Sequence, residues 1–238
     1  MRQLVLDLLP ENPPSLDNFV PGANAQALTA VSAWKKARHH EPFLFLWGES
    51  GAGKTHLLRA CSSHYVDASA APDLPGLDAV TGEASDHFAV DNVDALDATG
   101  QITLFNLFNR LRAAGGRLLA AASQPPLQLA LREDLRTRLG SGLIFRLHAL
   151  SDEEKISALA AQAKARGLSL PSGALDYLLA RVPRDMRSLM AFLVALDRYS
   201  LEHKRPITLP LLREVLLTPE LMTQPTLARK DHHAPRSI

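Results

Sequence analysis

The residues of this sequence that are best suited to chemistry form the stretch Gly-Glu-Ser-Gly-Ala-Gly-Lys-Thr at positions 48–55. It has the pattern G-x-x-x-x-G-K-[ST], in which backbone N–H groups of a glycine-rich turn and of the following helix surround phosphate oxygens. Lys54 would reach the β- and γ-phosphates of a nucleotide, and the Thr55 hydroxyl would ligate Mg²⁺. An ordinary glycine-rich turn is the alternative. An apolar strand before this P-loop and a helix after it favour nucleotide binding by Gly48, Gly51, Ala52, Gly53, Lys54, Thr55 and His56.

A second group of polar residues follows two later strands. Residues 88–90 are apolar and lead into Asp91, and residues 117–122 lead into Ser123. In open parallel sheets the ligand-binding groups lie at the carboxyl ends of the strands. We therefore expect Asp91 to hold the Mg²⁺ that Thr55 ligates, rather than only to cap a helix. We expect Ser123 to orient a water molecule or to contact the γ-phosphate.

A sheet is needed to bring these residues together, and the sequence alternates strands with helices. Strands are predicted at 43–47, 64–67, 88–91, 117–122 and 143–147, and helices at 24–38, after the P-loop and at 101–114. In the last of these helices we expect Ile102, Phe105, Phe108 and Leu111 to form one buried face. The alternation, with a P-loop on the first strand, predicts an α/β fold with a doubly wound parallel sheet.

The pattern changes at Ser151, where an all-helical segment begins. Ser151 and Glu154 have the spacing of a capping box, and apolar residues then recur at helical intervals as far as residue 217. We expect a flexible peptide at 1–15, an α/β nucleotide-binding domain at 16–150, a small helical domain at 151–217 and a disordered tail at 218–238.

Composition restricts the classes of partner. The 238 residues carry a formal net charge of +1, so contact with nucleic acid or a membrane surface would need a local patch. No apolar run reaches membrane-spanning length, and Asp7 and Pro10 interrupt the apolar start, so we expect a cytoplasmic protein without a signal peptide. The single cysteine, Cys61, excludes a disulfide scaffold and is expected to be a small buried residue.

The first residues of the chain are suited to binding a partner. Gln3, Leu4, Leu6, Asp7 and Leu8 belong to a short, largely apolar strip that precedes a proline-rich stretch. Such a strip suits an extended peptide bound in the groove of another protein, and equally an edge strand of its own domain. The residues alone leave both interpretations open.

Four short motifs, taken in their order along the chain, carry a family resemblance. They are Leu16-Asp17-Asn18-Phe19-Val20, Val90-Asp91-Asn92-Val93, Arg136-Thr137-Arg138-Leu139 and Asp185-Met186-Arg187-Ser188-Leu189. With them, residues 15–217 resemble the AAA+ ATPase domain and lid of the DnaA-type replication initiators. The initiators' DNA-binding helix-turn-helix is missing after the lid, and the N-terminal strip is similar to peptides that bind the bacterial sliding clamp. In both respects the chain resembles the Hda type, the regulatory inactivators of DnaA.

The resemblance implies roles for individual residues. Arg138 resembles the arginine finger that enters a neighbouring subunit's nucleotide site, and Arg187 resembles the sensor-2 arginine, which contacts phosphate from the lid. Ser123 falls at the sensor-1 position, and Phe19 and Val20 resemble the segment that lines the adenine pocket. A finger brings an always-charged guanidinium to the charge that develops on the γ-phosphate, which is worth roughly 10³ to 10⁵ in rate.

The same resemblance implies a function. A regulator of this type binds ATP or ADP with Mg²⁺, ADP being favoured. Tethered to the DNA-loaded sliding clamp, the β subunit of DNA polymerase III, it makes a DnaA-type initiator hydrolyse its ATP and so prevents re-initiation. Contact with DNA would be mostly indirect, through the clamp. A homo-oligomer is compatible with the family, and no membrane partner is expected.

Asn92 bears on the chain's own ATP hydrolysis. Many AAA+ enzymes have a glutamate directly after the metal-binding aspartate to activate water, whereas an amide can orient water but cannot accept its proton. We therefore expect weak intrinsic ATPase activity. Asp94 could substitute as the base only if the backbone turns, because a residue three positions along a strand points to the opposite face.

Two other functions are compatible with the sequence. A P-loop also serves autonomous ATPases and small-molecule kinases; the absent glutamate and the N-terminal strip argue against them. A helicase loader of the same superfamily, acting on DNA, is the second alternative. The near-neutral charge and the lack of a recognisable DNA-reading element argue against it.

Overall fold

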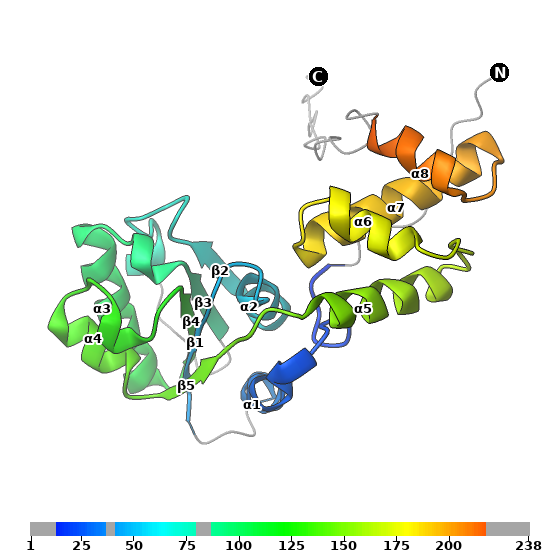
Figure 1. The fold of residues 1–238 in the computed structure, drawn as a ribbon. Coiled ribbons are helices and arrows are strands. Elements are labelled where there is room, and N and C mark those ends of the chain that lie inside the picture. Colours follow the sequence, from blue (N-terminus) through cyan, green and yellow to red (C-terminus); the bar gives the residue numbers. More distant parts are fainter. Residues whose placement is uncertain (1–12, 37–40, 80–86, 218–238) are drawn as a thin grey trace, which may run out of the picture. The chain divides into compact units, whose positions relative to one another are not determined.

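The computed structural model describes residues 13–36, 41–79 and 87–217, which form two compact units (Figure 1). The first unit ends at Glu154 and the second begins at Lys155. The predicted clamp-binding strip at 3–8 and the predicted tail at 218–238 lie outside the described residues. No helix in the described part of the chain has the length and apolar character needed to span a membrane.

The first unit is built on a five-stranded sheet in which every pairing is parallel. The strands are β1 (Phe43–Trp47), β2 (His64–Asp67), β3 (His87–Asp91), β4 (Arg117–Ala122) and β5 (Leu143–Arg146), in the spatial order β2-β3-β4-β1-β5. The first strand thus lies inside the sheet between β4 and β5. This arrangement confirms the predicted α/β fold with a parallel sheet.

Helices cover both faces of the sheet because successive residues of each strand point to opposite sides. Phe43 and Phe45 of β1 pack with α3 (Ala98–Ala114) and α4 (Glu133–Leu139) in one core. Leu44 and Leu46 pack with α1 (Ala25–Lys35) and α2 (Lys54–Cys61) in the other. In Figure 1 the two pairs of helices lie on opposite sides of the sheet. The sheet is therefore doubly wound, as predicted.

The helix after the P-loop is held by its buried face. Leu57 and Leu58 of α2 are fully buried, and each contributes about 1.5–3 kcal/mol relative to exposure. Cys61 is buried and unpaired, as predicted, and its burial raises its pKa to about 11. The start of α2, which follows the glycine-rich turn, is thereby fixed against the sheet.

The predicted buried face of the helix at 101–114 is wrong in part. In α3 the buried side chains include Leu104, Leu107, Phe108 and Leu111, whereas Ile102 is 46% exposed. The helix begins at Ala98, where the carboxylate of its N-cap, Asp97, accepts a hydrogen bond from the Gly100 N–H. The buried face of the helix includes Leu104, and Ile102 is therefore exposed to solvent.

The second unit is all-helical. Its helices are α5 (Asp152–Ala165, whose first residues belong to the first unit), α6 (Ala174–Arg181), α7 (Met186–His203) and α8 (Leu209–Leu216). The capping box is confirmed: the Ser151 N–H donates to Glu154 Oε2, and the Glu154 N–H donates to Ser151 Oγ. Leu178 of α6, Phe192 of α7 and Leu211 of α8 are completely buried in one apolar core.

Candidate functional site

The P-loop backbone has positive φ values at its glycines. Gly51 and Gly53 have φ values of +79° and +94°, a region that side chains other than glycine disfavour. A Cβ at Gly53 would lie 2.7 Å from Cε2 of Phe19, whereas a Cβ at Gly51 would meet nothing within 4 Å. The loop is therefore packed against Phe19 at one glycine and open at the other, which leaves room for a ligand beside Gly51.

The ammonium group of Lys54 is held by the loop itself. Its Nζ donates to the carbonyl oxygens of Gly48 at 2.7 Å and Glu49 at 2.9 Å. Partial burial lowers the pKa of Lys54, and the nearby carboxylates of Asp91, Asp94 and Glu49 offset part of this effect. An anion beside the loop would stabilise the charged form of Lys54, because opposite charges favour ionisation.

The carboxylate of Asp91 receives three hydrogen bonds. Thr55 Oγ1 donates to Asp91 Oδ2 at 2.6 Å, the Tyr65 hydroxyl donates to the same oxygen at 3.1 Å, and the Asn92 N–H donates to Oδ1. Asp91 is completely buried at the carboxyl end of β3. Burial and the adjacent Asp91 charge raise the pKa of Tyr65 to about 12, partly opposed by Arg59, so its hydroxyl remains a donor.

These residues fit a Mg²⁺ ion bound with a nucleotide. Thr55 and Asp91 place a hydroxyl and a carboxylate oxygen side by side, the hard oxygen ligands that Mg²⁺ prefers, and nucleotide phosphates usually supply others. When bound, Mg²⁺ would neutralise charge on the phosphates. Within the described ranges no cluster of three or more His, Cys, Asp or Glu side chains forms a metal site of another kind.

The side chain of Asn92 is hydrogen-bonded to the neighbouring strand, β2. Its backbone is left-handed, with φ of +52°, and its Nδ2 donates to Asp67 Oδ1 at 2.8 Å. The same oxygen accepts the N–H and the hydroxyl of Ser69. Partial burial acts to raise the pKa of Asp67, but these hydrogen bonds outweigh it and the pKa is lowered. The Asn92 amide is therefore engaged with β2.

Ser123 and Asp94 form a pair at the end of the neighbouring strand. The Ser123 hydroxyl donates to Asp94 Oδ2 at 2.6 Å, and its N–H donates to the same atom at 3.3 Å. Asp94 lies in a short 3-10 helix, Val93–Ala95, because the chain turns at Asn92 directly after β3. Both side chains are exposed.

The segment predicted to line an adenine pocket lies against the P-loop. The Phe19 ring packs on Gly53 and stands 5.5 Å from the His56 ring, centroid to centroid. His56 Nε2 lies 2.9 Å from the carbonyl oxygen of Ser15, which joins α2 to the chain that precedes Phe19. Phe19 and Val20 are both partly buried. The structure therefore places one aromatic ring, that of Phe19, beside the P-loop.

Arg138 lies near the end of α4 and is partly exposed. Its guanidinium carbon is 5.9 Å from the ring centroid of Phe105 and 6.0 Å from that of Phe108. Among the described residues it has no ion pair with a carboxylate, whereas Arg132, at the other end of the helix, is paired with Asp134 at 2.7 Å. In the part of the chain that the structure describes, the Arg138 guanidinium therefore lies near two aromatic rings and has no carboxylate partner.

Arg187 belongs to the helical unit. It is exposed in the first turn of α7, two residues after the N-cap residue Asp185. The Asp185 carboxylate accepts the N–H of Ser188 at 2.9 Å, which fixes the start of the helix around Arg187. The structure brings the other predicted nucleotide-binding residues together in the first unit, and Arg187 lies in the second.

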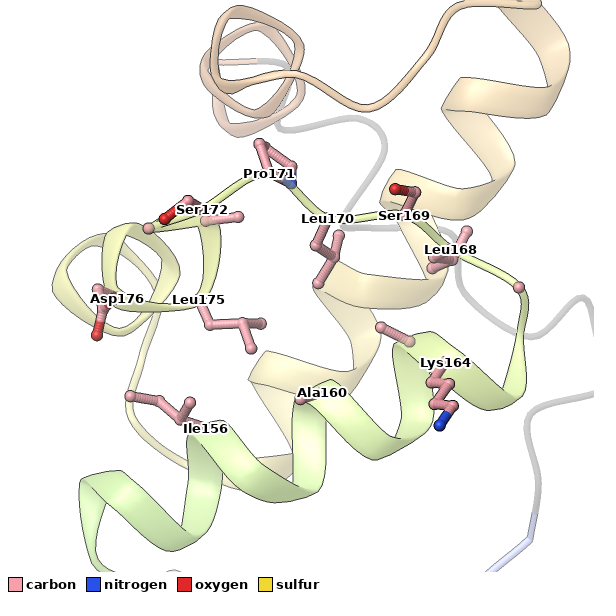
Figure 2. A pocket seen from close by; sticks show the side chains of 14 residues that line it. Ile156, Ala160, Lys164, Leu168, Ser169, Leu170, Pro171, Ser172, Leu175 and Asp176 are labelled. Atoms are coloured by element: carbon pink, nitrogen blue, oxygen red, sulfur yellow. The ribbon is translucent and has the colours of Figure 1, made fainter.

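The helical unit has a hollow of its own, of about 610 Å³. It lies between α5 and α6, and Figure 2 shows Leu170 and Leu175 turned toward it, with Ile156 and Ala160 of α5 on its other side. Its lining includes none of the residues that the sequence predicted for nucleotide or partner binding.

Sequence reasoning missed the contribution of β2. Tyr65 bonds to Asp91 at the end of β3, and Asp67 bonds to Asn92 directly after it, because β2 pairs with β3 in a register that places Asp67 beside Asp91. The Arg59 guanidinium lies over the Tyr65 ring, 4.3 Å from its centroid. No local signal indicates that β2 is the neighbour of β3, so these side chains could not be assigned to the site.

Two family models match this chain. Residues 11–99 match the bacterial DnaA ATPase domain, and residues 152–216 match the Hda lid domain. The first match falls on the unit that contains the sheet, and the second falls on the helical unit.

Several solved structures have the same fold. Domain III of the replication initiation protein DnaA from Thermotoga maritima has a TM-score of 0.70 at 21% identity, covering 90% of this chain and 98% of that one. AMPPCP-bound DnaA from Aquifex aeolicus has a TM-score of 0.61 at 22% identity, covering 79% and 66%. A variant of RuvB from Thermotoga maritima has a TM-score of 0.63 at 19% identity, covering 86% and 72%.

Proposed function

We propose that this chain, whose two units match the models of the bacterial DnaA ATPase domain and of the Hda lid domain, is an AAA+ protein that regulates replication initiation by completing the nucleotide site of a DnaA-type initiator. In this proposal the chain binds ATP or ADP with Mg²⁺ at its own P-loop. Arg138 is the group that it offers to the initiator, and ADP is the nucleotide that shapes the regulatory form.

The observation that supports this proposal most directly is that the Arg138 guanidinium has no carboxylate partner among the described residues. Phosphoryl transfer spreads negative charge over the γ-phosphate oxygens, and a planar, permanently charged group can donate several hydrogen bonds to them. A guanidinium already paired with a carboxylate would have to break that pair first. Arg138 has no such pair among the described residues and is supported only by the Phe105 and Phe108 rings.

The nucleotide in the chain's own site would be held by residues of three elements. The P-loop amides would receive the phosphates, with Lys54 beside them, and Thr55 and Asp91 would hold the metal ion. Phe19 would face the base. The AMPPCP-bound DnaA of Aquifex aeolicus is a nucleotide complex of a protein with this fold.

We also propose that the strip at 3–8 tethers the chain to the sliding clamp. Its support is the sequence: Gln3 followed by Leu4, Leu6 and Leu8 suits an extended peptide whose alternate side chains enter pockets of a partner. Tethering would raise the local concentration of Arg138 near clamp-bound DNA without any new contact.

One experiment tests the finger. ATP turnover by a DnaA-type initiator is measured with clamp and DNA, in the presence of the parent chain, of Arg138→Ala or of Arg132→Ala. Arg138→Ala should reduce the stimulation by at least a hundredfold while nucleotide binding by the variant is retained. Arg132→Ala, which removes a charge at the N-cap of the same helix, should stimulate like the parent. Equal stimulation by all three proteins would refute the role of Arg138.

The tether is tested separately. Gln3→Ala combined with Leu6→Ala should abolish co-elution with the clamp, and it should lower stimulation of the initiator at low protein concentration more than at high concentration. Retained co-elution of the double variant would refute the clamp-binding role of the strip.

A further inference from the structure

Asn92 and Asp94 both follow β3 closely, and the environments of their side chains differ. Asn92 follows Asp91 directly, but its amide donates to Asp67 of β2. Asp94 follows two residues later on a turn, and its carboxylate accepts hydrogen bonds from Ser123 of β4. The Asn92 amide is thus hydrogen-bonded on the side of β3 that faces β2, whereas the Asp94 carboxylate is exposed on the side that faces β4.

Strand register places the Asp94 and Ser123 pair beside the P-loop. In the sheet β4 lies between β3 and β1, and Ala122 of β4 is the partner of Trp47 of β1. The next residues along these two strands are Ser123 and Gly48, so the P-loop starts beside the residue that binds Asp94. The pKa of Lys54 also depends on the charge of Asp94, as expected for groups that are close in space.

We propose that Asp94, held by Ser123, is the group that activates water for this chain's own ATP hydrolysis. The inference rests on nucleotide binding at the P-loop, as proposed above, and is independent of Arg138. In this role Asp94 would supply the proton acceptor that the residue after Asp91, an amide, cannot provide. Asp94 is the catalytic residue, and Ser123 is a positioning residue that acts through it.

Hydrolysis at this site replaces one oxygen bound to the γ-phosphorus with another. The oxygen of a water molecule bonds to the γ-phosphorus while the bond from that phosphorus to the bridging oxygen breaks, and its electron pair leaves with ADP. The water proton passes to a carboxylate oxygen of Asp94 and is later released to solvent. One Asp94 oxygen, Oδ2, accepts the Ser123 hydroxyl and N–H, so Oδ1 is the atom that we assign to the water.

Single-turnover hydrolysis by the protein alone provides the test, with labelled ATP and excess protein. Asp94→Asn can still accept the Ser123 hydrogen bond but cannot take a proton, so its hydrolysis should fall by about 100-fold or more at unchanged ATP affinity. Ser123→Ala should lower the rate by about tenfold, and Ser123→Thr, which restores the hydroxyl, should recover most of it. The double variant Asp94→Asn, Ser123→Ala should be no slower than Asp94→Asn.

Several results would overturn the proposal. One is hydrolysis by Asp94→Asn at the parent rate. A second is a greater loss of hydrolysis rate in Asn92→Ala than in Asp94→Asn. A third is hydrolysis by the parent chain that is no faster than hydrolysis by Lys54→Ala. Equal loss of ATP affinity and of hydrolysis in Asp94→Asn would also overturn it, because the residue would then serve binding alone. Stimulation of the initiator is a separate measurement, so the finger and the Asp94 proposal can fail independently.

Discussion

The hydroxyl of Thr55 donates a 2.6 Å hydrogen bond to the carboxylate of Asp91, two residues that are 36 positions apart in the sequence. This bond joins the first turn of α2 to the end of β3 and brings together the two oxygen ligands that we assign to Mg²⁺. Tyr65 adds a second donor to the same carboxylate from β2.

The first prediction concerns this pair. Thr55→Val removes the hydroxyl while keeping a similar shape, so the variant should lose the part of its nucleotide affinity that depends on Mg²⁺, by about 10–100-fold. Binding in EDTA should change little. Titration of a fluorescent ATP analogue with and without Mg²⁺ measures both quantities. A variant whose affinity still responds fully to Mg²⁺ would show that Thr55 is not a ligand.

The second prediction separates two effects at the P-loop glycines. Gly51→Ala introduces a side chain at positive φ into open space, whereas Gly53→Ala adds a contact of 2.7 Å with Phe19. Both variants should lose stability, each by about 1–3 kcal/mol for the backbone strain alone. Gly53→Ala should lose more, and it should also displace Phe19 and weaken adenine-nucleotide binding. Denaturant unfolding of the two variants side by side tests the difference.

The third prediction asks whether Arg138 acts through charge alone. Arg138→Lys keeps a positive charge but loses the planar group with several donors, which is also the shape that stacks on Phe105 and Phe108. We expect the lysine variant to restore less than about a tenth of the stimulation lost in Arg138→Ala. Full recovery with lysine would indicate a simple electrostatic effect on the partner.

The fourth prediction concerns the cap of α7. Asp185→Ala removes the acceptor for the Ser188 N–H and should destabilise the helical unit by about 1 kcal/mol, whereas Asp185→Asn keeps an acceptor oxygen. Thermal unfolding of the three proteins at neutral pH measures this difference.

The same cap should be sensitive to acid. Partial burial acts to raise the pKa of Asp185, but hydrogen bonds with Ser188 outweigh it, and the folded-state pKa lies below the ordinary value. A group with a lowered pKa stabilises the fold above its ordinary pKa and loses that contribution as the pH falls through the folded value. The stability difference between the parent and Asp185→Ala should therefore be constant near neutral pH and shrink in acid. A difference that grows on acidification would contradict the assignment.

The local elements of the first unit were predictable because each depends on neighbouring residues. The P-loop pattern, the apolar runs of the strands and the capping box at Ser151 were all predicted from the sequence and are present in the structure. The buried face of α3 was predicted only in part, because Leu104 fits the stripe as well as Ile102 does and only packing against the sheet distinguishes them.

The sequence by itself determined that this chain has a glycine-rich P-loop turn after the first strand of a parallel sheet, because that turn and its flanking elements are contiguous. The tertiary structure alone decided which side chains gather around it. Strand order brings Tyr65 to Asp91, and strand order together with the turn at Asn92 brings Asp94 to Ser123. Such pairings depend on contacts between strands that are distant in sequence, and no local pattern of residues specifies them.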